Sequence, residues 1–315
     1  MIKNKATICI VNYKTLDLTR LCLRSVRKFT KYPYEVIVVD NNSQDESSEY
    51  LKHLSWIRLI ERRKIGDLLP LLSSGRKTQG PIDDCNLKVG GYAHAAGLDL
   101  GLASCNTEFF VSLHSDVFIQ KENWLTDIIR YFEPTGYERT GKKDEGRGMM
   151  DEGRPSSVVH RPSVVACVGS GKIELTPKWR ILLKKATDFR TFKRELLRDP
   201  DPMGKFRYYN RTICCLYRTD ILRRENLSFL MDRDKGLTGG KKLYFELVDR
   251  GYKTVELPSS IIGQYIVHLA HATQAVNPQE FTLRKKTIRK YNRMIDKVMS
   301  RALVQNILTD ESLDR

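Results

Sequence analysis

The chain has 315 residues, of which 41% are hydrophobic, and it carries a formal net charge of +16. Its length suits one large domain or two small ones, and its apolar fraction is ordinary enough for a sizeable core. The positive charge favours polyanionic partners, namely nucleic acid, anionic lipid headgroups or phosphorylated metabolites, although a solvated basic surface has the same composition.

Cysteine usage and the N-terminus narrow the class of protein. The seven cysteines are odd in number, include no CxxC pair and lie mostly in apolar runs. This indicates reduced, packed thiols rather than disulfides or a zinc site. The opening MIKNKATICIVNY has too short an apolar core for a signal peptide, and no run reaches the length of a transmembrane helix. We therefore expect a cytoplasmic protein that is soluble or peripheral at the inner face of a membrane.

Strands and helices alternate in the first part of the chain. Apolar runs predict buried strands at residues 6–11, 35–39 and 56–60, with helices after Thr15 and over residues 45–54. Such alternation is typical of parallel strands joined by right-handed crossovers. The sequence thus predicts an α/β fold with a Rossmann-type, mostly parallel sheet flanked by helices.

Polar residues close the first two predicted strands. Asn12 and Tyr13 follow the first strand, and Asp40 and Asn42 follow the second. Because successive parallel strands end at one edge of the sheet, we expect these four side chains to be neighbours. Asp40 could accept hydrogen bonds from a ribose or a base N–H; the alternative is an Asp that satisfies its own turn.

A helix rich in small residues is predicted at residues 90–103, after an irregular surface insertion at 61–89. Gly97 and Gly101 lie inside this helix, where each costs about 1 kcal/mol. They are tolerable where a ligand or another backbone comes close, and close helix–sheet packing is the commoner reason. His94 lies on the same helix and faces either the core or a phosphate.

The stretch FFVSLHSDV is the centre of the candidate site. A strand at residues 106–113 ends on His114, Ser115 and Asp116, and ligands of open α/β sheets bind at such carboxyl ends. A carboxylate placed there needs a partner, and a divalent cation on a phosphorylated ligand is a good one. The alternative is an Asp that caps the helix predicted at residues 122–132.

The second half of the chain alternates less regularly. We expect a mobile loop at 134–162, strands at 163–169 and 211–217, helices at 177–197, 218–224 and 241–250, and extended segments at 253–257 and 261–267. The last of these ends on His268, with His271 three residues later. The expected division of the chain is 1–133, 134–162, 163–277 and 278–315.

The tail predicts a long amphipathic helix over residues 278–307 with a strongly basic face. Such a helix fits the interface of an anionic membrane. The alternative is a helix that packs on the body of the protein and exposes its basic face to solvent.

The order of these motifs resembles that of inverting family 2 glycosyltransferases of the GT-A fold. The resemblance rests on ICIVNYKTLDLTRLCLRSV, on YEVIVVDNNSQDES, on GGYAHAAGLDLGLA followed by TEFFVSLHSDV, and on IVHLAHAT. It implies a GT-A-like fold with a variable acceptor-side half. It also implies transfer of a sugar from a nucleotide-sugar donor, with UDP-sugars favoured, to a glycan or lipid-linked acceptor, as in cell-envelope polysaccharide biosynthesis.

The resemblance also implies roles for individual residues. Asp116 would bind Mn²⁺ or Mg²⁺, and His268, which we favour over His271, would be a second ligand. The donor-binding residues would be Val11, Asn12, Tyr13, Asp40, Asn42, His94, Gly97, His114 and Ser115. The metal would stabilise the charge that builds on the diphosphate leaving group.

Two departures from the family pattern concern the chemistry. The first aspartate of the DxD motif is His114 here, and the place of the acidic pair that usually supplies the catalytic base falls on Gly239 and Gly240. Asp234 is our candidate for the base, with Asp232 beside it. The departure also leaves open a protein of the same fold that binds a nucleotide sugar without turnover.

Two other functions, nucleic-acid binding and nucleotidyl transfer, fit the sequence less well. The charge of +16 suggests nucleic-acid binding, but lysines and arginines are spread along the chain and no RRM, KH or helix-turn-helix pattern occurs, so we do not expect nucleic acid as a partner. A nucleotidylyltransferase would need a Gly-rich phosphate loop after the first strand, and VNYKTLD contains no glycine.

Overall fold

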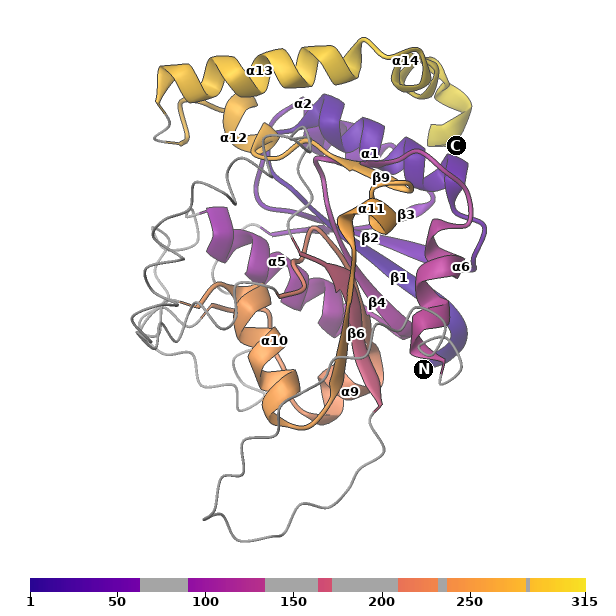
Figure 1. Cartoon of the computed structure of the whole chain (residues 1–315). Coiled ribbons are helices and arrows are strands. Elements are labelled where there is room, and N and C mark those ends of the chain that lie inside the picture. Colours follow the sequence, from indigo (N-terminus) through magenta and orange to yellow (C-terminus); the bar gives the residue numbers. More distant parts are fainter. Residues whose placement is uncertain (63–89, 134–163, 172–208, 232–236, 282–283) are drawn as a thin grey trace, which may run out of the picture.

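A seven-stranded sheet forms the centre of the computed structural model (Figure 1). The structure describes residues 1–62, 90–133, 164–171, 209–231, 237–281 and 284–315. The strand order is β3-β2-β1-β4-β7-β6-β8. The strands are β1 (Ile2–Asn12), β2 (Tyr34–Asp40), β3 (Ile57–Glu61), β4 (Thr107–His114), β6 (Val165–Ser170), β7 (Cys214–Arg218) and β8 (Lys253–Leu257).

The register of the first four strands brings their polar ends together. The pairs β1–β2, β1–β4, β2–β3 and β6–β8 are parallel, whereas β7 runs antiparallel to β4 and β6. Asn12 is opposite Asp40, and Val11 is opposite His114. The expectation of an α/β fold with a mostly parallel sheet is confirmed, and the polar ends of β1, β2 and β4 share one edge.

Helices cover both faces of the sheet, as a parallel sheet requires. Alternate residues of β1 enter different cores: Ile8 and Ile10 pack toward α1 and α6, and Cys9 and Val11 pack toward α5 and α10 (Figure 1). The helices of this part are α1 (Leu16–Phe29), α2 (Glu46–Lys52), α5 (Gly90–Ser104), α6 (Trp124–Ile129), α9 (Thr219–Arg224) and α10 (Gly239–Asp249), and a 3-10 turn, η2 (Arg130–Phe132), follows α6.

The glycines of α5 allow it to lie very close to β1. A Cβ atom built on Gly97 would meet Val11 Cγ1 at 2.9 Å, and one built on Gly101 would collide with Cys9 Sγ. Packing therefore accounts for both glycines. A contact of Gly97 or Val11 with a donor stays a prediction.

A second, two-stranded sheet joins distant parts of the chain. β5 (Val117–Ile119) pairs antiparallel with β9 (Ile266–His268), and Val117 lies opposite His268. The extended segment expected at 261–267 is wrong in its first residues, because α11 (Ser259–Ile262) is helical there. The amides of Ile261 and Ile262 both donate to the Pro258 carbonyl, which closes a helical turn.

The single C-terminal helix expected at 278–307 is also wrong. The structure has α12 (Ala272–Val276), α13 (Lys285–Met299), α14 (Ala302–Thr309) and a 3-10 turn, η4 (Glu311–Asp314). The break at Ser300 and Arg301 lets α13 pack beside α12 while α14 turns onto α1. Each segment thereby buries its own apolar pair, Ile295 with Val298 and Val304 with Ile307.

Several expectations fall outside the described residues. These are most of the insertion at 61–89, the loop at 134–162, the helix at 177–197, and Asp232 and Asp234. The division of the chain at residues 133, 162 and 277 stays a prediction. Within the described residues, no helix combines the length and the apolar character that crossing a membrane requires.

Candidate metal and nucleotide site

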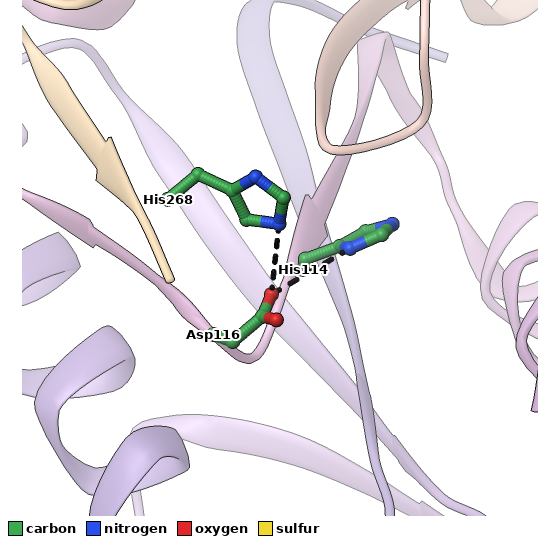
Figure 2. Close-up of side chains that lie close together, drawn as sticks. All are labelled: His114, Asp116 and His268. Atoms are coloured by element: carbon green, nitrogen blue, oxygen red, sulfur yellow. Dashed lines mark ion pairs between the residues drawn. The ribbon is translucent and has the colours of Figure 1, made fainter. Parts of the chain in front are cut away.

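Three side chains from two distant segments converge at the carboxyl end of β4. His114 ends β4, Asp116 lies in the turn before β5, and His268 ends β9 (Figure 2). Pairing of β5 with β9 places His268 opposite Val117, and the Leu269 amide donates to the Asp116 carbonyl at 2.9 Å. The backbone of the small sheet therefore fixes the position of this cluster.

Figure 2 shows both imidazoles directed at one oxygen of Asp116. His268 Nε2 lies 3.4 Å and His114 Nδ1 lies 3.6 Å from Asp116 Oδ1. Among the residues that the structure describes, none donates a hydrogen bond to this buried oxygen. An unsatisfied buried carboxylate oxygen is costly, and a cation placed between the three groups would satisfy it.

The charge state of Asp116 suits a ligand. Burial by itself would raise the pKa of this carboxyl, but the opposing effects of His268 and His114 are larger, and the pKa lies below its usual range. Asp116 is therefore ionised at neutral pH. One atom from each of Asp116, His114 and His268 can be chosen so that all three lie within 4.8 Å of one another, a spacing that one ion can bridge.

The donor set indicates which cations fit. One carboxylate and two imidazoles suit Mn²⁺ and related transition metals better than Mg²⁺, which prefers oxygen ligands. Three protein ligands leave coordination positions for another ligand, such as phosphate oxygens. The sequence had indicated His114 as a donor-binding residue, and the structure places it beside the expected ligands Asp116 and His268.

His94 lies beside the cluster on α5. Its ring centroid is 4.5 Å from that of His114, in an edge-on arrangement. Its Nε2 atom is buried and makes no hydrogen bond to a described residue. Burial lowers the pKa of His94 to about 3, and His114 acts in the same direction. His94 is therefore a neutral imidazole packed against His114, whose Nε2 lies 3.5 Å from Thr212 Oγ1.

His271, the alternative to His268, points elsewhere. Its side chain is exposed, its Nδ1 lies 3.0 Å from Gln274 Oε1, and its ring packs 5.0 Å from that of Tyr291. The choice of His268 over His271 as the histidine beside Asp116 thus agrees with the geometry.

Asp40 is occupied by bonds within the protein. Its Oδ1 accepts from Asn12 Nδ2 at 2.7 Å and from Ser43 Oγ at 2.6 Å, and its Oδ2 accepts from the Ser43 amide at 3.1 Å and from Ser48 Oγ at 3.0 Å. Four acceptor sites are the capacity of a carboxylate. The network ties the end of β1 to the start of α2, and a nucleoside contact of Asp40 or Asn12, which stays a prediction, would have to replace one of these bonds.

Two residues at the same edge of the sheet, Asn41 and Arg62, are not among the site residues predicted from the sequence. Asn41 Nδ2 and Arg62 Nη1 both donate to the Ala93 carbonyl, at 3.1 and 3.2 Å, and both side chains are buried. Asn41 Oδ1 is buried and accepts no hydrogen bond from the described part of the chain. The neighbouring Asn42, which the sequence singled out, is exposed with a left-handed φ of 58°. Nothing in the pattern NNS distinguishes the two asparagines.

The remaining expected donor residues are spread around this edge. The Tyr13 hydroxyl donates to Glu280 Oε2 at 3.1 Å, and Lys14 Nζ pairs with Glu280 Oε1 at 2.6 Å, so the loop after β1 is tied to the C-terminal region. Ser115 is buried in the turn between His114 and Asp116.

The start of α10 lies close to the cluster but holds no acid. A Cβ on Gly240 would lie 3.1 Å from Thr212 Cγ2, and one on Gly239 would collide with the Phe229 carbonyl. The first turn of this helix contains no carboxylate. The two glycines that replace the family's acidic pair, Gly239 and Gly240, therefore allow α10 to pack closely against neighbouring residues. Asp234, the expected base, lies outside the described residues.

A comparison with known protein families agrees with the resemblance seen in the sequence. Residues 7–66 match the family model described as Glycosyl transferase family 2, which confirms that resemblance over β1, β2 and β3. No curated protein matches the chain significantly.

Solved glycosyltransferase structures resemble the chain at 14% identity. They include the mannosyltransferase PcManGT from Pyrobaculum calidifontis in complex with GDP-Man and Mn²⁺, with a TM-score of 0.44 over 80% of this chain and 54% of that chain. Glucosyl-3-phosphoglycerate synthase from Mycobacterium tuberculosis, in complex with Mn²⁺, UDP and glucosyl-3-phosphoglycerate, has a TM-score of 0.44 over 94% of this chain and 79% of that chain. TarS 1-349 from S. aureus has a TM-score of 0.40 over 91% of this chain and 69% of that chain.

This chain therefore spans about half the length of the mannosyltransferase chain from Pyrobaculum calidifontis.

Proposed function

We propose that this chain is a metal-assisted glycosyltransferase that moves a sugar, with inversion, from a nucleotide-sugar donor to a glycan or lipid-linked acceptor. A UDP-sugar is the favoured donor. The observation that carries the proposal is the cluster of His114, Asp116 and His268 at the carboxyl edge of the parallel strands of a mostly parallel sheet. The segment that matches the family model contributes Asn12 and Asp40 to the same edge, at the ends of β1 and β2.

The three clustered side chains would hold Mn²⁺ in preference to Mg²⁺. When bound, the cation supplies positive charge to a diphosphate leaving group without proton transfer. Asp116 contributes the negative ligand, because its pKa lies below the usual range in spite of its burial. His268 and His114 contribute ring nitrogens, and the neutral His94 ring packs against His114. A neutral neighbour adds no charge that would oppose cation binding.

The nucleoside of the donor would lie along the ends of β1, β2 and β3. Asn41 Oδ1 is a buried acceptor without a donor among the described residues, so it could receive a base N–H. Asp40 would act on the donor indirectly, by holding the backbone of Asn41 and Asn42 in place through its bonds to Asn12 and Ser43.

The acceptor hydroxyl needs a general base on the face of the sugar opposite the diphosphate. We propose Asp234 for this role, with Asp232 as the second choice, because the first turn of α10 holds no carboxylate. A variant with Asp234→Asn would then retain nucleotide binding and lose at least about 100-fold in transfer rate.

Calorimetric titration tests the donor site. UDP, GDP and dTDP are titrated with Mn²⁺ and with EDTA into the wild type, Asp116→Asn and His271→Ala. We expect one nucleotide to bind only with Mn²⁺, to lose its affinity in Asp116→Asn, and to bind normally to His271→Ala, which removes an exposed histidine that contacts Gln274 rather than Asp116. Absence of binding to every nucleotide, or equal binding with EDTA, would overturn the proposal.

A second candidate function follows from the start of α10. Gly239 and Gly240 take the place where the family has its acidic pair, so the chain could bind a nucleotide sugar without turning it over. Metal-dependent binding of the intact donor, with neither hydrolysis nor transfer in the presence of acceptor and with the same result for Asp234→Asn, would favour this function over the enzyme.

A further inference from the structure

The helix α13 lies at the periphery of the described part of the protein, above α12 in the view of Figure 1, and its outer side faces away from the other described elements. Its main apolar side chains pack against the body of the protein. Ile295 and Val298 are buried in a cluster with Leu18, Val267 and Ala272. The apolar face of α13 is therefore covered by the body of the protein and is not available for insertion into a bilayer.

The opposite face of α13 is a row of exposed cations. We call it the basic face; it consists of Lys285, Lys286, Arg289, Lys290, Arg293 and Lys297 of α13, together with Arg301 just after this helix. One acidic residue, Asp296, occurs in the same stretch. None of the seven cations forms an ion pair with a residue that the structure describes.

The shape of the basic face indicates the kind of partner. A helix of 15 residues spans about 22 Å, and its cations are exposed along its length. Such a row matches a plane of negative charges better than a single phosphate group. Binding of single-stranded nucleic acid commonly uses exposed aromatic rings that stack on bases. The aromatic residue of α13, Tyr291, is half-buried and packs on His271.

We propose that the basic face docks this protein onto an anionic membrane surface by electrostatic adsorption alone. Each basic residue close to an anionic bilayer strengthens adsorption roughly fivefold. Docking would also orient the candidate site. Tyr291 of α13 contacts His271, which lies three residues after His268, so the segment that carries His268 runs beside the docked helix. The inference does not depend on the proposed catalytic function.

Vesicle sedimentation tests the proposal. The full chain is mixed with vesicles of phosphatidylcholine alone and with vesicles of an equimolar mixture of phosphatidylcholine and phosphatidylglycerol, at low and high salt. The test variant neutralises four cations of the basic face: Lys286→Gln, Arg289→Gln, Lys290→Gln and Arg293→Gln. The matched control removes four exposed cations elsewhere: Lys3→Gln, Lys31→Gln, Lys52→Gln and Lys121→Gln. Thermal melting of both variants verifies that they are folded.

We expect the wild type and the control variant to sediment with the anionic vesicles only, and to be released by high salt because such contacts are screened. The test variant should lose at least about tenfold in partition coefficient. Three results would overturn the proposal: equal losses in the two variants, binding that is independent of lipid charge, or no binding of the wild type. Tighter binding to RNA than to anionic vesicles at the same salt concentration would instead assign the face to a soluble polyanion.

Discussion

At the scale of single residues, the cation preference of the proposed metal site would depend on His114. It stands where the resembling family has the first aspartate of its DxD motif, and its Nδ1 lies 3.6 Å from Asp116 Oδ1. An imidazole in place of a carboxylate exchanges a hard oxygen ligand for nitrogen, which suits Mn²⁺ better than Mg²⁺. It also removes a second negative charge from the neighbourhood of the buried Asp116, and like charges at such a distance oppose each other.

The variant His114→Asp tests this preference. We expect the ratio of UDP affinity in Mg²⁺ to UDP affinity in Mn²⁺ to rise, because the ligand set gains a carboxylate. Titration calorimetry in each metal measures the ratio. His271→Asp makes the same chemical change at an exposed histidine away from Asp116 and should leave the ratio unchanged. A ratio that is the same in His114→Asp and the wild type would show that His114 is not a ligand.

The neighbouring residues Asp40, Asn41 and Asn42 show how far a sequence can resolve such a site. Their position at the end of β2 follows from the apolar run before them and is confirmed. Which of them retains a free acceptor depends on bonds from Asn12 and Ser48, and on the left-handed conformation of Asn42 that turns it outward. Those contacts come from other elements, so the local pattern does not contain them.

At the scale of elements, the distance between α5 and β1 is set by two glycines. An alanine at Gly97 would gain about 1 kcal/mol in helix propensity, but its Cβ would lie 2.9 Å from both γ-carbons of Val11. Valine is stiff about χ1, so it cannot move aside easily. Overpacking of a core costs about 1–3 kcal/mol, and the clash should therefore outweigh the gain in propensity.

We expect Gly97→Ala to lower the free energy of unfolding by up to about 2 kcal/mol. In the double variant Gly97→Ala, Val11→Ala the added methyl group has room, so a double-mutant cycle should give a favourable coupling energy. Urea unfolding measures all three variants. Gly91→Ala, whose Cβ would be 3.4 Å from Met231 Cε, is the control and should be neutral or stabilising. Additive effects of the two core changes would contradict the close contact.

The C-terminal element is held to α1 and α2 by a partly buried ion pair. Arg24, with a side chain that is 5% exposed, pairs with Asp314 and donates to the Leu308 carbonyl, and the Tyr50 hydroxyl donates to Asp314 at 2.7 Å. Burial tends to raise the pKa of Asp314, but the bonds from Arg24 and Tyr50 prevail and lower it. The carboxylate is thus more stable in the folded chain than in the unfolded one.

We expect Asp314→Asn to destabilise the protein by about 1–3 kcal/mol, because a buried guanidinium loses its charged partner. The wild-type contribution should be complete above the ordinary Asp pKa of about 3.9 and lost as the pH falls through the lower folded value. Urea unfolding at neutral and acidic pH measures both effects. Asp17→Asn removes a carboxylate that is 69% exposed and should change little. A loss in Asp314→Asn that is equally large at low pH would contradict the role of the ionised pair.

At the scale of the whole molecule, predictability follows the length and locality of the elements. β1, β2 and β4 are long apolar runs, and their order along the chain implies their neighbours. β5 and β9 have three residues each and no periodicity, and the two are far apart in the sequence. Their pairing, which brings His268 to Asp116, results from the closure of the whole chain. The motif IVHLAHAT indicated the histidine only through its resemblance to a family.

This topology would couple binding of the proposed metal to global stability. The proposed ligands Asp116 and His268 lie beside or at the end of strands that pair across the fold, so the unfolded chain does not hold them together. A ligand that binds the folded state alone stabilises it by RT ln(1 + [L]/Kd), or about 2.7 kcal/mol when the concentration is 100 times Kd. Mn²⁺ should therefore raise the melting temperature progressively with concentration.

We expect this rise in the wild type, its reversal by EDTA, and its absence in Asp116→Asn and His268→Ala. Thermal melting over a titration with Mn²⁺ measures it, and His271→Ala, which keeps the cluster intact, should respond like the wild type. Loss of the response in both cluster variants would tie the cation to the junction of β5 and β9. A shift of equal size in all the variants would instead place the cation elsewhere on the protein, because neither Asp116 nor His268 would then be needed to hold it.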